Sequence, residues 1–439
     1  MFRSVLNGLP RRRLTAVLTV SILASVLPRE ADGQAPYEQD PINYNTAPAA
    51  DPVARLQQRL QGGEARLQQD GPQGYLKALL RELDVPVSSQ TLVFSKTSFQ
   101  RDRISPSTPR ALYFDDNTYV GWVKGGDVIE LASVDPNLGT VFYTLDQRTP
   151  AKLVRQSQNC LQCHGSSMTR DVPGLLVRSI FPDSQGQPIL SAGTFLTTQE
   201  SPIRQRWGGW YVTGKHGRQR HMGNVVVKNE ADPEGSLDTE SGANVLDLSS
   251  KFDTSGYLSG HSDIVALMVL EHQAQMHNLL TRANHQTRIA LRDAAAMNAS
   301  LGRPTDHLSD GTRERIKDAG EAVVRYMLFA DEAALGSIEG SSSFQDEFEA
   351  RGPKDMVGRS LRELDLKRRL FKYPCSHLIY SEQFDALPAP VKEYVYRRLF
   401  DILTGAEDSG TFSHLSRSTR RDILEILRGT KQGLPEYWK

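Results

Sequence analysis

Residues 160 to 164 of this 439-residue chain read Cys-Leu-Gln-Cys-His, and this C-x-x-C-H run is the most informative feature of the sequence. Two thiols at this spacing can add across the two vinyl groups of haem, and the adjoining imidazole can bind the iron. The run therefore predicts one covalently attached haem, haem c. Cys160 and Cys163 are the candidate thioether links, and His164 is the candidate proximal ligand of the iron.

Dithiol redox sites and zinc sites also use C-x-x-C pairs. A zinc ribbon needs a second C-x-x-C or a paired histidine further along, and a thioredoxin-like dithiol usually opens a helix in a βαβ pattern. Neither pattern accompanies this motif. The sequence therefore favours haem attachment over both alternatives.

Cys160, Cys163 and His164, followed by Gly165, resemble the haem-attachment site of c-type cytochromes. The resemblance covers this short segment and implies the two thioether links and the proximal ligand given above. A small soluble cytochrome c carries its motif near the start of a helical domain of roughly 100 residues. Here the motif lies deep in the chain between strand-like segments, so the usual cytochrome fold is not expected. A di-haem peroxidase is disfavoured because the chain has a single C-x-x-C-H run.

The N-terminus predicts export. Arg11 to Arg13 form a charged region, and Leu14 to Leu27 form an apolar stretch shorter than the roughly 20 residues of a membrane-spanning helix. Ala31 to Gly33 then offer the small residues that signal peptidase accepts. We expect residues 1–33 to be a signal peptide, with Gln34 as the mature N-terminus of a periplasmic or otherwise exported protein. The alternative is an uncleaved membrane anchor.

Charge and cysteine content narrow the choice of partners. Lys and Arg together number 52, as do Asp and Glu, so no strong net field attracts nucleic acid or an anionic membrane. We expect no nucleic-acid partner, and no stable membrane insertion once the signal is cleaved. The redox partner protein and the oligomeric state are not identified by the sequence. Cys375 has no intrachain partner if the motif holds haem, and its apolar neighbours favour a buried thiol over intermolecular pairing.

Periodicity predicts an α+β fold, with an antiparallel β-rich haem-binding half followed by a mostly helical C-terminal half. We expect a flexible lead-in over residues 34–70, a β-rich haem c-binding region over 71–258 and a helical region over 259–439. Short β-branched and aromatic runs separated by turn residues predict a meander before the motif. The predicted strands are 91–94, 111–114, 118–123, 128–134, 140–145, 175–181, 189–195 and 207–213, and the predicted helices start near 76, 264, 391 and 416.

The sixth coordination position of the iron separates electron carriers from ligand-binding haem proteins. Met222 is the first candidate for this distal position, because Gly223 lets the backbone come close and aromatic residues precede it. His221 is the second candidate. His272 ranks lower, since it lies on a helix that reads as buried on nearly every face. The alternative for all three is an ordinary role in the core or at the surface.

These observations favour a mono-haem c-type cytochrome that transfers single electrons. Two alternatives stay open. One is a haem c enzyme with an open distal site and oxidoreductase chemistry, because an electron carrier does not need a chain of this length. The other is a haem-based sensor. The sequence identifies no catalytic residues for an enzyme.

Overall fold

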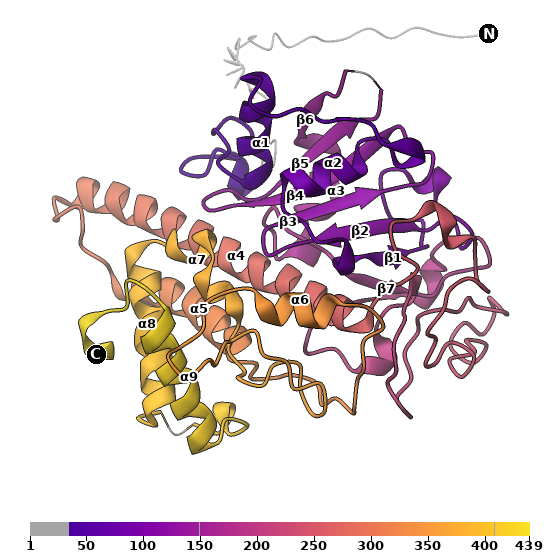
Figure 1. Ribbon diagram of the computed structural model, residues 1–439. Coiled ribbons are helices and arrows are strands. Elements are labelled where there is room, and N and C mark those ends of the chain that lie inside the picture. Colours follow the sequence, from indigo (N-terminus) through magenta and orange to yellow (C-terminus); the bar gives the residue numbers. More distant parts are fainter. Residues whose placement is uncertain (1–34, 149, 408) are drawn as a thin grey trace, which may run out of the picture. The chain divides into compact units, whose positions relative to one another are not determined.

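The computed structural model describes residues 35–148, 150–407 and 409–439. The predicted signal peptide, residues 1–33, and the predicted mature terminus Gln34 lie outside the described residues. The described chain has a β-rich N-terminal half and a mostly helical C-terminal half (Figure 1), which confirms the predicted α+β class.

A seven-stranded antiparallel sheet, in the order β6-β5-β4-β3-β2-β1-β9, organises the N-terminal half (Figure 1). Strands β7 and β8 form a separate antiparallel pair. The strands are β1 (Thr91–Val93), β2 (Arg110–Phe114), β3 (Thr118–Trp122), β4 (Val128–Asp135), β5 (Gly139–Asp146), β6 (Leu153–Gln156), β7 (Arg178–Ile180), β8 (Thr194–Leu196) and β9 (Trp210–Tyr211). The predicted meander is confirmed over β1 to β5, whereas β6 was not predicted.

Helix α4 (Ile264–Leu301) is far longer than the other helices of the described chain. Strong capping explains where this helix begins, because the Asp263 side chain accepts hydrogen bonds from the backbone N–H groups of Val265 and Ala266. The helices are α1 (Pro52–Gln61), α2 (Leu76–Glu82), α3 (Gln158–His164), α4 (Ile264–Leu301), α5 (Asp310–Met327), α6 (Phe344–Ala350), α7 (Glu382–Asp385), α8 (Ala389–Thr404) and α9 (Arg417–Thr430).

One face of the sheet packs against α1, α2 and the segment before α1. A flexible lead-in is predicted over residues 34–70, but within its described part Tyr37, Ile42 and Tyr44 are buried in this core. The Tyr44 hydroxyl donates a 2.8 Å hydrogen bond to the carbonyl of Thr140 on β5. Irregular backbone without apolar periodicity is therefore held by a few large side chains, which a periodicity argument does not detect.

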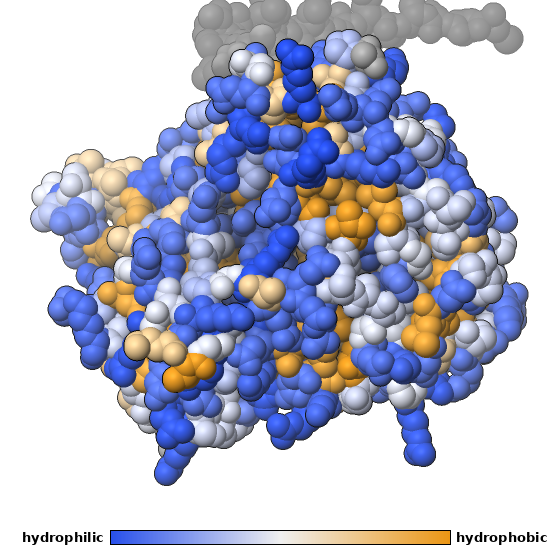
Figure 2. All heavy atoms as spheres, in the orientation of Figure 1, coloured by the Kyte–Doolittle hydropathy of each residue, from blue (hydrophilic) through white to orange (hydrophobic). Residues whose placement is uncertain are grey.

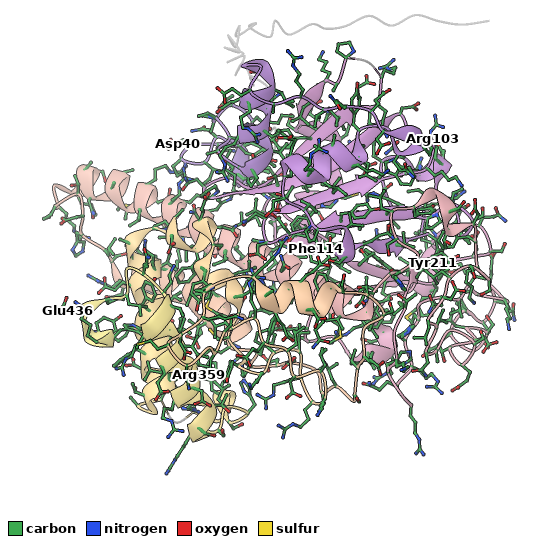
Figure 3. The ribbon with its side chains drawn as sticks, in the orientation of Figure 1. Asp40, Arg103, Phe114, Tyr211, Arg359 and Glu436 are labelled. Atoms are coloured by element: carbon green, nitrogen blue, oxygen red, sulfur yellow. The ribbon has the colours of Figure 1, made fainter. Side chains whose placement is uncertain are left out.

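The opposite face of the sheet packs in part against α4 and α6. Phe114 of β2 lies at this junction (Figure 3), where its ring centroid is 5.6 Å from that of Phe344 on α6. Helices α5, α7, α8 and α9 share a second apolar core with part of α4, and this core also holds Cys375. Cys375 is fully buried, as predicted, and burial raises the pKa of its thiol to about 12.

The surface that Figure 2 shows is mostly hydrophilic and carries small apolar patches. Among the described residues, no helix is both long enough and apolar enough to span a membrane.

Candidate haem-attachment site

The predicted motif forms the short helix α3, which follows the edge strand β6. Cys160, Cys163 and His164 are spaced i, i+3 and i+4, so they share one face of this helix. Cys160 is half-buried, Cys163 is exposed, and neither thiol is in a disulfide. The structure therefore brings the three motif residues together on one helix face.

His164 is held by a reciprocal pair of hydrogen bonds with Gly174. Its Nδ1 lies 2.9 Å from the carbonyl oxygen of Gly174, and the Gly174 N–H donates a 2.8 Å bond to the carbonyl of His164. Because a carbonyl oxygen can only accept, Nδ1 carries the ring proton and Nε2 carries the lone pair. Burial lowers the pKa of His164, which favours this neutral form. The ring is thus prepared to ligate a metal through Nε2.

The loop that supplies Gly174 is fastened to the long helix α4. Asn278 of α4 accepts a 2.8 Å hydrogen bond from the N–H of Leu175 and donates a 2.9 Å bond to the carbonyl of the same residue. A Cβ atom at position 174 would lie 2.2 Å from the Asn278 Oδ1 atom, so glycine is needed there. The orientation of His164 therefore depends on α4, more than 100 residues away in the sequence.

Helix α3 lies beside the face of the sheet that carries Phe142 of β5. The Phe142 ring centroid lies 4.9 Å from that of His164. Nearby, Arg110 of β2 and Glu130 of β4 form an ion pair with 2.6 Å between Nη2 and the carboxylate, and both side chains are mostly buried. Burial raises the pKa of the Cys160 thiol to about 11; the charge of Glu130 adds to this rise and that of Arg110 opposes it.

Met222 lies apart from the motif. It is 3 % exposed in a small apolar cluster with Phe181 and Val227, and the Ser179 hydroxyl lies 3.5 Å from its sulfur. Leu161 and Cys160 belong to a different apolar cluster. Met222 and the motif helix α3 therefore belong to different apolar clusters.

His221 is buried, and its ring centroid lies 5.2 Å from that of Trp207. Its Nδ1 accepts a 3.0 Å hydrogen bond from the Gly223 N–H, while its buried Nε2 has no hydrogen-bond partner among the described residues. Burial lowers the pKa of His221 to about 3. Its ring contacts are with Trp207 and His216, and none is with the motif.

His272 lies in the core that α4 shares with the helical half. Its Nδ1 is 2.6 Å from Gln199 Oε1, its Nε2 is 2.8 Å from Ser376 Oγ, and its ring stacks on Phe329. Both ring nitrogens are thus engaged, so His272 would have to give up a hydrogen bond to bind iron. In the structure His272 is a core residue whose two ring nitrogens both have hydrogen-bond partners.

Sequence reasoning identified the three motif residues and missed their surroundings, namely Phe142 and Gly174, which contact His164, Asn278, which holds the Gly174 loop, and the nearby charges of Arg110 and Glu130. Side chains point alternately to the two faces of a sheet, and the lengths of the turns in a meander set how its strands pair. The sequences of β2 and β4 could therefore have placed Arg110 and Glu130 on one face of the sheet. No local signal could have linked Gly174 to Asn278, since that contact depends on the packing of α4.

No family model matches the chain, and no curated protein or solved structure matches it either. In the part of the chain that the structure describes, no group of three or more His, Cys, Asp or Glu side chains is arranged to hold a metal ion by itself.

The donor set of the motif fits a covalently bound haem. Two free thiols and an imidazole with an available Nε2 lone pair share one helix face. Cys160 and Cys163 would hold the vinyl carbons of haem c, and His164 would ligate its iron. When bound, that group supplies one-electron chemistry at iron. The chain contributes attachment through α3 and orientation through Gly174 and Asn278.

Proposed function

We propose that the protein is an exported mono-haem c-type cytochrome that transfers single electrons through covalently bound haem. The observation that carries this proposal is the reciprocal pairing of His164 and Gly174, which gives the histidine of the C-x-x-C-H motif the tautomer that ligates iron. The exposed position of Cys163 supports the electron-transfer role, because a haem tethered there has an edge near solvent. Export rests on the N-terminal sequence.

A redox titration tests this function. Protein matured by a cytochrome c assembly system should show a haem c spectrum and one reversible one-electron transition. It should also exchange electrons with a small soluble redox protein without consuming a substrate. A protein that takes up no haem, or whose iron does not cycle reversibly, would contradict the proposal.

A second function is favoured by one observation: Met222, His221 and His272 each lie in contacts separate from the motif. A haem c whose sixth position has no protein ligand can bind small molecules, as enzymes and sensors do. Carbon monoxide binding distinguishes the two functions. Rapid binding by the ferrous wild-type protein supports the open site, and slow binding to low-spin iron supports the carrier.

A further inference from the structure

The irregular segment before α1 belongs to the same core as the haem-attachment helix. We call this segment, residues 36–51, the strap. Its Tyr37 and Tyr44 lie in one apolar cluster with Leu161 of α3, and Cys160 packs against that cluster. The two tyrosine rings contact each other edge-on, with 5.9 Å between their centroids. The strap therefore supplies two aromatic side chains to the core on which α3 packs.

The strap binds the chain just before the motif through Arg155. This residue lies on β6, the strand that leads into α3, and its guanidinium donates hydrogen bonds to the backbone carbonyls of Tyr44 and Ala47. The same guanidinium lies 5.2 Å from the centre of the Tyr44 ring. Burial raises the pKa of Tyr44, Arg155 opposes this rise, and the nearby Cys160 thiol adds to it. Tyr44 is therefore placed between β6 and the first cysteine of the motif.

The strap also contacts the chain just after the motif, through Tyr37. Gly165 follows His164, and a Cβ atom at position 165 would lie 2.3 Å from the Tyr37 hydroxyl oxygen and 3.0 Å from the ring carbon that carries it. The hydroxyl end of Tyr37 thus stands directly against the Gly165 backbone. Because this backbone is outside the left-handed region, the contact with Tyr37, more than the backbone conformation, calls for glycine here.

The strap and the loop that holds His164 meet at one residue of β5. The carbonyl of Thr140 accepts a 2.8 Å hydrogen bond from the Tyr44 hydroxyl. The N–H of Thr140 donates a 3.0 Å bond to the carbonyl of Pro173, the residue before Gly174. Gly174 is the residue that holds the imidazole of His164. Two segments fixed to the same strand therefore hold the end of the motif.

The strap is itself fastened to the sheet and to α4. The N–H of Ala50 donates a 2.6 Å hydrogen bond to the carboxylate of Asp135 on β4. Arg288 of α4 donates a 2.6 Å bond to the carbonyl of Pro41, next to Asp40, which marks the strap in Figure 3. A segment held at both of these points can fix the position of α3.

We propose that Tyr37 is a positioning residue of the haem site: through Gly165 it fixes the end of α3 from which His164 binds iron. The proposal rests on the function proposed above. Tyr37 acts on the backbone that carries the imidazole and does not itself touch the iron. Its loss should leave haem covalently attached to Cys160 and Cys163 and should weaken the bond between the imidazole and iron.

The pH at which acid releases His164 from ferric iron tests this role in the holoprotein, and optical absorption measures it. Loss of a group that orients a metal ligand typically weakens metal binding by about 10- to 100-fold. Release of the imidazole takes up one proton, so a tenfold weaker bond to iron raises the release midpoint by about one pH unit. Tyr37→Ala should show this rise. Tyr37→Phe, which keeps the ring beside Gly165, should restore the wild-type midpoint.

Tyr257→Ala is the matched control for a general loss of stability. Tyr257 lies in the same apolar cluster and is 7 % exposed, against 6 % for Tyr37, but its ring contacts are with Trp122 and Phe252. Both alanine variants should unfold at lower denaturant concentrations than the wild type. Only Tyr37→Ala should release His164 at a higher pH. Equal release midpoints in the two alanine variants would overturn the proposal.

Gly165→Ala gives a second test that leaves the Tyr37 side chain in place. The added methyl group meets the Tyr37 hydroxyl, so this variant should also raise the release midpoint. In the Tyr37→Ala background the same methyl group should have little further effect, because the atoms that it meets are gone. Gly260→Ala, whose methyl group meets nothing within 4 Å, is the control and should release His164 at the wild-type pH.

The outcomes separate the role of Tyr37 from the proposed function. A raised midpoint in both Tyr37→Ala and Gly165→Ala, without additivity in the double variant, supports the positioning role. A wild-type midpoint in Gly165→Ala, or equal effects of this substitution in the two backgrounds, overturns that role while the haem stays covalently bound. Wild-type protein without covalent haem overturns the proposed function itself.

Discussion

His164 and Gly174 exchange two hydrogen bonds, one from the imidazole Nδ1 and one from the glycine N–H, at 2.9 and 2.8 Å. The pair fixes the tautomer of the only histidine in the C-x-x-C-H motif. It also connects the motif to α4, because Asn278 binds both backbone groups of the next residue, Leu175. Substitutions in this chain of contacts should therefore change the stability of the protein and the properties of the proposed haem iron.

Gly174→Ala should destabilise the protein by about 1–3 kcal/mol, because the added methyl group would lie 2.2 Å from the Asn278 Oδ1 atom. Denaturant unfolding measures the change in the free energy of unfolding. Gly260→Ala is the control, since a Cβ atom at position 260 meets nothing within 4 Å and its backbone is not in the left-handed region. Equal stabilities for the two variants would contradict the packing described for Gly174.

Asn278→Ala should cost about 2–3 kcal/mol, because it leaves the buried N–H and carbonyl of Leu175 without their partners. The reduction potential of the holoprotein should also change, since the Gly174 carbonyl that holds His164 becomes less firmly placed. Asn45→Ala removes an exposed hydrogen bond to Glu38 and serves as the control. A destabilised variant with an unchanged potential would show that the loop orients His164 without help from α4.

Acid should destabilise the protein in a way that depends on His285. Burial lowers the pKa of His285 to about 3, so below about pH 6.5 the unfolded chain binds a proton that the folded chain does not. Its contribution to stability is thus present above about pH 6.5 and is lost as the pH falls toward 3. His285→Gln should reduce the slope of unfolding free energy against pH by up to about 1.4 kcal/mol per unit between pH 6 and 4.

Thr287→Val is the control for this pH dependence, because it alters a buried neighbour on α4 without removing a titrating group. Its slope should equal that of the wild-type protein. A His285→Gln slope that also matches the wild type would show that His285 takes up its proton in the folded state.

Met222→Leu and His221→Gln should leave the spin state of the iron unchanged, because neither side chain contacts the motif. Electronic absorption and electron paramagnetic resonance of the ferric holoprotein measure the spin state. Conversion of a low-spin wild-type spectrum to high spin in either variant would identify that residue as the distal ligand and contradict the separation seen in the structure.

The elements that the sequence predicted correctly are those with a local signal. Strands β1 to β5 are short runs rich in β-branched and aromatic residues between clear turns, such as the one where Asp115 accepts hydrogen bonds from the N–H groups of Asn117 and Thr118. Strand β6 has four residues and sits at the sheet edge, so its pattern is too short to recognise. The pairing of β9 with β1 joins segments more than 100 residues apart, and no local pattern encodes it.

The candidate site also has one part with a local sequence signal and one part without. Cys160, Cys163 and His164 are adjacent in sequence, and one turn of helix brings them together. The distal candidates Met222 and His221 were inferred from a local concentration of Trp, His and Met. In the structure that concentration belongs to buried packing, in which the Trp207 indole donates a 3.2 Å hydrogen bond to Glu271 of α4. A distal ligand is a long-range relationship, and residue types alone do not establish it.

Covalent haem on Cys160 and Cys163 can be detected in the mass of the denatured protein. Protein matured by a cytochrome c assembly system and extracted with acidified acetone should keep one haem, seen as a single added haem mass on the polypeptide. The Cys160→Ala/Cys163→Ala variant should lose all of it, while Cys375→Ala should retain it, because Cys375 is buried in the separate helical core. Wild-type protein without the added mass, or a double variant that still carries it, would contradict the account.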